Sequence, residues 1–252
     1  MNRPLLRETY PFTPAVAELF PQLPAGVSHL HKVILPVARN CCMSCCYCRQ
    51  LPYPCTICHS QQVDVLTPLQ AARALAAVAP PFVVEIGGQG DPIMNEETFQ
   101  TLRLLTIENI TAPTFLTTTG LCILDRLDDI LSVRPNVLKV IINSLDPKIG
   151  SRLVDSVIYR NKVVRGIDGA FLLQEKQVKG IKRLLAKGLT VAVETVSLSG
   201  LNAGHIPELV DALVALGIHY MDLRMGPGTT RDRRQFQRLR GEIAQRITLV
   251  SF

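Results

Sequence analysis

Apolar segments that suit buried β-strands alternate with segments that suit helices along most of this chain of 252 residues. Near-continuous apolar strands that are each followed by a helix are typical of a parallel sheet with helices on its faces. We therefore predict an α/β fold built from six strand–helix units. The predicted strands are residues 31–38, 82–88, 114–120, 137–146, 190–198 and 220–226, and the predicted helices are residues 67–79, 95–108, 123–133, 169–187, 205–216 and a final basic helix.

The two ends of the chain differ in composition from this alternating part. Residues 1–30 are interrupted by proline, and we predict an irregular lead-in there. Residues 31–230 hold the strand–helix units, with a longer irregular stretch expected before the helix at 169–187. Residues 231–252 are predicted as a basic helix, because residues 231–246 hold six Arg against Asp232 and Glu242, a local net charge of +4.

Composition excludes several classes of protein. A hydrophobic content of 47% excludes a disordered chain. No apolar run reaches the roughly 18 residues that a membrane helix needs, so we expect no membrane association. The N-terminal segment has proline and acidic residues where a signal peptide needs an apolar core, so we expect a cytoplasmic protein. The basic C-terminal segment favours a solvated helix face over a nucleic-acid site, because aromatic residues are not interleaved with its basic ones.

Cysteines are the most informative residues, because seven of the eight lie between Cys41 and Cys58. Such crowding without a secretion signal points to metal binding rather than to disulfides. Cys41, Cys45 and Cys48 form C-x3-C-x2-C directly after the first predicted strand. Three thiolates can hold three irons of a cubane cluster and leave the fourth iron open. Zinc is the alternative, although only six residues separate Cys48 from Cys55, against about 12–20 in most zinc motifs.

Polar and glycine-rich segments follow the predicted strands. In parallel α/β folds the chemistry lies at the carboxyl ends of the strands, where these segments fall. Glycine lets a backbone approach a ligand closely. The candidates are Gly87, Gly88, Gln89, Gly90 and Asp91 after the second strand, Thr118 and Thr119 after the third, Asn143, Ser144 and Asp146 after the fourth, Glu194 and Ser197 on the fifth, and Met225 on the sixth.

The cysteine motif with Tyr47 before its last cysteine resembles the radical SAM superfamily. The resemblance implies a partial (β/α)6 TIM-like barrel over residues 31–230 and a 4Fe–4S cluster on Cys41, Cys45 and Cys48. It implies that the amine and carboxylate of S-adenosyl-L-methionine (SAM) chelate the open iron. Tyr47 and the polar residues at the strand ends are then the candidates for binding SAM.

Segments from about residue 33 to 206 resemble, in order, the radical SAM core of the NifB-type nitrogenase cofactor maturases. The matching segments include LPVARNC, LTPLQA, GGQGDP, NSLDPKIG, VIYRNKVVRG and SGLNAGH. The resemblance implies a role in iron–sulfur cluster or metallocofactor maturation, a low-potential electron donor such as a ferredoxin or flavodoxin, and an iron–sulfur scaffold or carrier protein as partners. It also implies an accessory cluster, for which Cys55, Cys58 and His59 are the candidate ligands.

Three departures from the NifB pattern keep other functions open. Ile34 stands where the family usually has a histidine, no cysteine follows Cys122, where the family carries a C-terminal pair, and Glu194 stands where the family tends to have asparagine. One alternative is a radical SAM enzyme that modifies a peptide, a nucleic acid or a small molecule. Another is a non-enzymatic iron–sulfur or zinc module. Cys42, Cys46 and Cys122 could pack as free thiols or bind metal.

Overall fold

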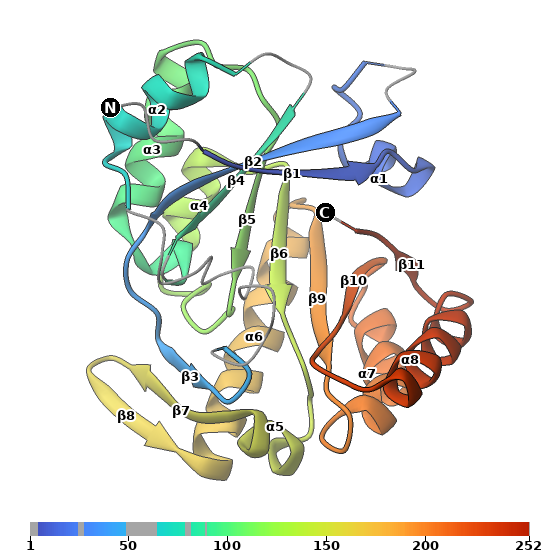
Figure 1. Ribbon diagram of the computed structural model, residues 1–252. Helices are drawn as coiled ribbons and strands as arrows, with labels where there is room; N and C mark the ends of the chain where they lie inside the picture. Colours follow the sequence, from blue (N-terminus) through green and yellow to red (C-terminus); the bar gives the residue numbers. More distant parts are fainter. Residues whose placement is uncertain (1–4, 25–27, 49–64, 79–81, 89, 252) are drawn as a thin grey trace.

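An eight-stranded sheet forms the centre of the molecule and curls into an open half-barrel (Figure 1). The computed structural model describes residues 5–24, 28–48, 65–78, 82–88 and 90–251. Six parallel strands correspond to the six predicted ones: β2 (His29–Ala38), β4 (Phe82–Gly88), β5 (Thr114–Thr118), β6 (Val137–Ile141), β9 (Val191–Ser197) and β10 (Tyr220–Met225). Two further strands complete the edges, β1 (Leu6–Pro11) antiparallel to β2 and β11 (Thr248–Leu249) parallel to β10.

Helices cover the outer face of the sheet, as the alternating pattern predicts. They are α2 (Pro68–Ala76), α3 (Glu96–Ile107), α4 (Leu127–Val133), α6 (Gly166–Ala186), α7 (Ile206–Ala215) and α8 (Thr230–Ile243), with short 3-10 turns at Pro92–Met94 and Ala203–His205. The start of α2 shows how the sequence sets such a boundary. Thr67 and Gln70 cap its first turn reciprocally, and Pro68 occupies the first helical position. Between the sheet and these helices lies the main apolar core.

The N-terminal segment closes the amino-terminal end of the half-barrel, and the prediction of an irregular lead-in is wrong there. Helix α1 (Pro14–Leu19) begins at Thr13, whose side chain accepts a hydrogen bond from the Val16 amide. Val16 and Phe20 are buried against side chains of the inner face of the sheet, including Phe115. Strand β1 exists because β2 supplies its hydrogen bonds, a tertiary contact that composition does not reveal.

A second, three-stranded sheet joins the cysteine segment to the stretch that we predicted as irregular. It has the order β3 (Met43–Cys45), β7 (Val154–Tyr159) and β8 (Lys162–Arg165), all antiparallel, and α5 (Pro147–Leu153) precedes it. The irregular-stretch prediction is therefore wrong. The turn between β7 and β8 uses Arg160 and Asn161, both at positive φ, instead of the Asn-Gly pair that marks such hairpins in sequences.

The basic C-terminal helix is also shorter than predicted. It ends at Ile243 rather than continuing to residue 252, and β11 follows it along the edge of the sheet. Among the described residues, none of the helices has the length and apolar character needed to span a bilayer.

Candidate active site

The cysteine segment begins at the carboxyl end of β2 and runs into β3. Cys41, Cys45 and Cys48 are all half-buried, while their neighbour Cys46 is exposed. Cys45 pairs in register with Val154 of β7, and the Cys46 amide donates to the Leu153 carbonyl at 2.9 Å. The second sheet therefore fixes the backbone of the segment that carries the three predicted ligands.

Gly90 brings the glycine-rich turn after β4 against the same segment. A Cβ atom at Gly90 would lie 2.0 Å from the carbonyl oxygen of Asn40, so the position has no room for a side chain. The Asp91 amide donates to that same carbonyl at 2.8 Å. Asn40 immediately precedes Cys41, and the turn thus holds the start of the cysteine segment directly. Gly87 and Gly88 end β4 beside Pro36 and Ala38 of β2, and Gln89 lies outside the described residues.

Asp91 is fully buried and links this turn to the end of β5. Its Oδ2 accepts hydrogen bonds from both the amide and the hydroxyl of Thr119 and from the hydroxyl of Thr118, at 2.6–3.0 Å. Its Oδ1 accepts from the Ile93 amide. Burial raises the pKa of Asp91 to about 6, as does the nearby Cys41, while the bonds from the two threonines lower it. The structure therefore uses these three predicted SAM-binding residues to hold the turn against β5.

Tyr47 and Asn143 connect the cysteine segment to strands β6 and β9. The buried Tyr47 hydroxyl accepts a hydrogen bond from the Asn143 side-chain amide at 2.7 Å. The Asn143 carbonyl oxygen Oδ1 accepts from the Val196 amide, and the side chain of Asn202 bridges the Asn143 and Val196 carbonyls. Asn202 is a linking residue that we did not predict, although it lies in the SGLNAGH segment.

Ser144 and Asp146 lie at the start of α5. The Asp146 side chain caps this helix by accepting from the Lys148 and Ile149 amides at 2.7 and 3.3 Å. The Ser144 hydroxyl accepts from the Asp146 amide. Their polar groups thus satisfy the local backbone, and the structure does not bring them to the cysteine segment through any of these bonds.

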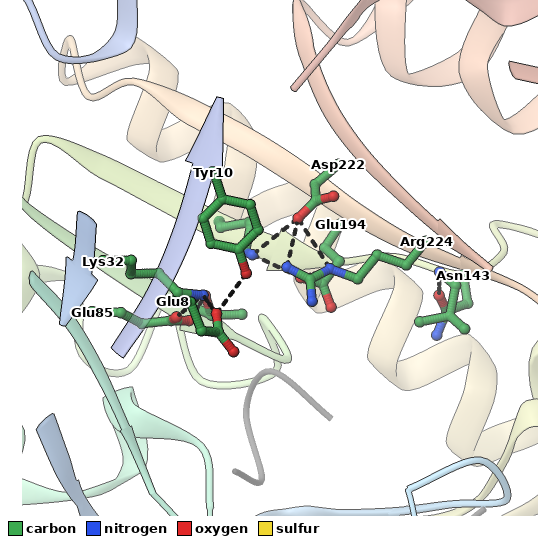
Figure 2. A network of polar contacts seen from close by, with 11 residues as sticks. Glu8, Tyr10, Lys32, Glu85, Asn143, Glu194, Asp222 and Arg224 are labelled. Atoms are coloured by element: carbon green, nitrogen blue, oxygen red, sulfur yellow. Dashed lines mark hydrogen bonds and ion pairs between the residues drawn. The ribbon is translucent and has the colours of Figure 1, made fainter. Parts of the chain in front are cut away.

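Glu194 belongs to a charged layer in the interior of the half-barrel (Figure 2). Its carboxylate lies 2.7 Å from the ammonium of Lys139, which is fully buried and 3.4 Å from Asp222. Arg224 pairs with the carboxylates of both Asp222 and Glu194, at 2.9 and 3.3 Å. These carboxylates raise the pKa of Arg224 well above its usual range, although burial alone would lower it.

A second part of the charged layer lies toward β1. Lys32 is fully buried 2.9 Å from Glu85 and 2.5 Å from Glu8, and the Tyr10 hydroxyl also donates to Glu8. Tyr10 also lies close enough to Arg224 of β10 to affect its pKa, so β1 and β10 approach each other across the interior (Figure 2). The burial of these two lysines was not predicted, because the sequence does not show whether a lysine on an apolar strand faces the interior or the solvent.

Ser197 and Met225 lie in register at the carboxyl ends of β9 and β10. Both line a cavity of about 300 Å³ that continues along the loop after β9 to the first turns of α8. Ser199, Asp232 and Phe236 contribute to its wall. Two of the predicted SAM-binding side chains thus border this cavity.

The accessory-cluster candidates Cys55, Cys58 and His59 lie outside the described residues. Cys122, which the sequence leaves alone, lies beside the buried Cys42 in space. Hydrogen bonds with Cys122 and Cys41, together with burial, raise the pKa of the Cys42 thiol. The described residues include no group of three His, Cys, Asp or Glu side chains placed around one metal ion.

The donor chemistry nevertheless fits an iron–sulfur cluster. A cubane takes one thiolate on each of three irons, and Cys41, Cys45 and Cys48 supply these thiols from one short segment. Because Gly90 has no side chain, the glycine-rich turn packs directly against this segment. The hydrogen bond from Asn143 holds Tyr47 in place.

Solved structures share this fold. SuiB of Streptococcus suis bound to S-adenosylmethionine matches 88% of this chain with a TM-score of 0.60 at 16% identity, over 50% of that chain. Histidine-tagged anSMEcpe with bound AdoMet matches 86% of this chain with a TM-score of 0.59 at 13% identity, over 62% of that chain. The predicted partial barrel of the radical SAM type is thereby confirmed. A comparison with models of known protein families finds no match.

The relatives found by sequence comparison include several NifB proteins. The FeMo cofactor biosynthesis protein NifB of Herbaspirillum seropedicae is 34% identical over 199 residues, which cover 75% of this chain and 37% of that protein. NifB of Methanocaldococcus infernus is 30% identical over 184 residues, or 71% of this chain and 61% of that protein. Over these residues the chain is similar to the NifB proteins. NifB of Klebsiella pneumoniae extends the match to 81% of this chain at 32% identity.

The similarity to NifB confirms the predicted resemblance. It covers only part of each NifB protein. The chain spans 37–63% of the length of the first NifB proteins that it matches.

Proposed function

We propose that this chain is a radical SAM enzyme that cleaves SAM reductively and acts in the maturation of an iron–sulfur metallocofactor. The NifB relatives are named FeMo cofactor biosynthesis proteins. The observation that carries the proposal is the position of the C-x3-C-x2-C segment. It lies at the carboxyl end of β2 in a half-barrel whose sequence is homologous to NifB. In such folds the reacting groups meet at the carboxyl ends of the strands.

Cys41, Cys45 and Cys48 would hold a 4Fe–4S cluster and leave one iron open to SAM. When bound and reduced by an external one-electron donor, the cluster would supply the electron for cleavage of SAM to methionine and a 5′-deoxyadenosyl radical. The glycine-rich turn keeps Asn40 and Cys41 in place, and Asn143 orients Tyr47. Ser197 and Met225 border the cavity that would take the adenosyl end.

The charged layer below the strand ends would shape the floor of the reaction chamber. Lys139, Glu194 and Asp222 satisfy one another there, so the floor is polar but closed. Helix α1 seals the opposite end with apolar side chains. Water and oxygen would therefore reach the radical only from the open carboxyl ends, where substrate also enters.

Removal of one ligand tests the proposal. Cys45→Ala should abolish formation of 5′-deoxyadenosine from SAM with dithionite after anaerobic reconstitution, because the cluster loses one of three thiolates. Cys46→Ala is the matched control, since Cys46 is the exposed neighbour on the same segment. Unchanged 5′-deoxyadenosine from the Cys45 variant would contradict the mechanism.

The nature of the substrate is a separate part of the proposal. A role in cluster maturation requires accessory clusters, so iron and sulfide per chain should exceed the roughly four of one cubane. A second candidate, radical chemistry on a peptide or small molecule, is favoured by Glu194, which stands where the NifB pattern has asparagine and which pairs with Lys139 and Arg224 in the charged layer. It predicts about four irons per chain. An iron–sulfur scaffold or carrier protein and a low-potential ferredoxin or flavodoxin complete the proposal as partners.

A further inference from the structure

Helix α8 begins beside the cavity at the carboxyl ends of β9 and β10 (Figure 1). Thr229 caps this helix only four residues after Met225 ends β10, and the Gly226 amide of the short link donates to the Ser197 carbonyl at 2.9 Å. Gln235 of α8 forms part of the cavity wall. The first turns of α8 therefore lie on the rim of the half-barrel where the strands end.

A row of arginines follows the exposed face of these turns. Arg231, Arg234 and Arg238 are exposed, and their spacing of three and four residues places them on one face of the helix, over about 10 Å. We call these three residues the arginine row. Gln235 lies four residues after Arg231 and three before Arg238, so it is their neighbour on the helix surface as well as part of the cavity wall. The arginine row thus lies beside the cavity.

The carboxylates near the arginine row leave this region positively charged. Residues 230–246 and α7, which packs against α8, together hold six Arg and four acidic side chains, a net charge of +2. The four carboxylates have other contacts: Asp232 with the Thr229 amide and hydroxyl, Glu242 and Asp211 with Arg246, and Glu208 with His205. Among the residues that the structure describes, no carboxylate forms an ion pair with a member of the row.

The arginine row does not stabilise the helix that carries it. Arg234 and Arg238 are four residues apart, a spacing at which like charges repel each other. Arg231 and Arg234 lie in the first turns, where the positive end of the helix dipole disfavours a cation. On α3, by contrast, the exposed Arg103 pairs with Glu96 at 2.7 Å. The charge of the row therefore fits a partner outside the chain better than a role in the fold.

We propose that the arginine row is the docking surface for an acidic protein that exchanges the iron–sulfur substrate with the half-barrel. A positive row beside the cavity is complementary to an acidic surface patch, and such complementarity speeds encounter and fixes orientation. A protein is favoured over a nucleic acid because Phe236, the aromatic residue of α8, is buried and offers no ring for base stacking. The proposal rests on the proposed function, which makes the cargo an iron–sulfur cluster.

The test compares charge reversal at two pairs of exposed sites. Arg234→Glu/Arg238→Glu changes the arginine row. Arg183→Glu/Lys187→Glu makes the same change, at the same spacing, at the end of α6, just before β9 begins and thus at the opposite end of the half-barrel. Each variant lowers the formal net charge from +6 by four, to +2. The probe is an acidic iron–sulfur scaffold protein loaded with 4Fe–4S clusters, and its dissociation constant is measured anaerobically at low and at physiological salt.

The row variant should bind the scaffold about tenfold more weakly than the wild type at low salt and lose most of the salt dependence. The rate of cluster transfer from the scaffold should fall by a similar factor. The α6 variant should stay within about twofold of the wild type, because its charges lie away from the docking surface. Arg234→Lys/Arg238→Lys keeps the charge and should bind within about threefold of the wild type.

Two results would overturn the proposal. One is equal binding by the row and α6 variants, whether both are weakened or neither is. The other is a row variant that loses binding to a single-stranded RNA oligonucleotide, tested in parallel, but not to the scaffold. Formation of 5′-deoxyadenosine with dithionite needs no scaffold, so the row variant should keep the wild-type rate within about twofold. Failure of the wild type in that assay would contradict the proposed function, and the binding comparison would still decide the docking surface.

Discussion

Gly90 shows how much one missing side chain contributes to the site. Its Cα hydrogen faces the Asn40 backbone, where a methyl group would lie 2.0 Å from the carbonyl oxygen. Gly90→Ala should therefore push the Asn40–Cys41 segment outward and lower the free energy of unfolding by about 1–3 kcal/mol. Urea unfolding of the anaerobic protein measures this loss. Gly241→Ala is the control, because open space surrounds that helical glycine, and there the change should be neutral or stabilising by up to about 1 kcal/mol. Equal stability of the Gly90 variant and the wild type would contradict the close approach.

Lys139 tests the energetics of the charged layer. Its ammonium is fully buried between Glu194 and Asp222, so Lys139→Met leaves buried carboxylates that lack this partner. We expect the variant to lose about 3–5 kcal/mol of stability. Removing Glu194 as well should recover most of that loss, because Arg224 still pairs with Asp222. A double variant Lys139→Met/Glu194→Leu that is as unstable as the single one would refute the pairing.

At the scale of residues, the sequence identifies chemistry better than it identifies contacts. The spacing of Cys41, Cys45 and Cys48 is enough to predict a cluster segment. The glycine at position 90 predicts a close approach, which we expected toward a ligand and which the structure makes toward the Asn40 backbone. The side chains that Asp91, Thr118 and Thr119 contact are not readable in the same way. A buried carboxylate that holds two hydroxyls and a carboxylate that faces a ligand have the same sequence signature, and only the packing of β4 against β5 separates them.

Helix α5 carries a prediction at the scale of elements. We expected Asp146 to bind SAM, whereas the structure uses it as the N-cap of this helix. Asp146→Ala should then cost about 0.5–2 kcal/mol of stability. Asp146→Ser, which keeps a capping oxygen, should lose much less, and both variants should bind SAM as tightly as the wild type in equilibrium dialysis. Weaker SAM binding by the serine variant would restore the original assignment.

Strands and helices with their own strong pattern were predicted, and elements that depend on partners were not. The six parallel strands are continuous apolar runs, so their existence follows from composition. Strand β1 contains Arg7 and Glu8 and depends on pairing with β2. Strands β7 and β8 turn through Arg160, which adopts a positive φ that is costly for a residue with a side chain. Contacts with β3 and α6 offset that cost, and no local signal encodes them.

The interior of the whole half-barrel is charged in the middle and apolar at its amino-terminal end. The buried titratable groups make the free energy of unfolding depend on pH. The carboxylates of Glu85 and Glu8 raise the pKa of Lys32, although burial alone would lower it. Burial, followed by the hydrogen bond to Glu8, raises the pKa of Tyr10. The folded protein therefore holds both protons more tightly than the unfolded chain, in which these groups have their ordinary values of 10.5 and 10.0.

The contribution of these two groups is complete below pH 10.0 and decreases as the pH rises through the folded-state pKa values. As the pH rises above about 10 in the presence of a reductant, the free energy of unfolding should fall more steeply for the wild type than for Tyr10→Phe/Lys32→Met. The double variant retains the aromatic ring and the apolar stem but has no proton to lose at either position. Its curve should start lower and lie flatter. Parallel curves for the two proteins would mean that β1 does not bring its glutamate and tyrosine into the interior, and that the N-terminal segment does not close the barrel in solution.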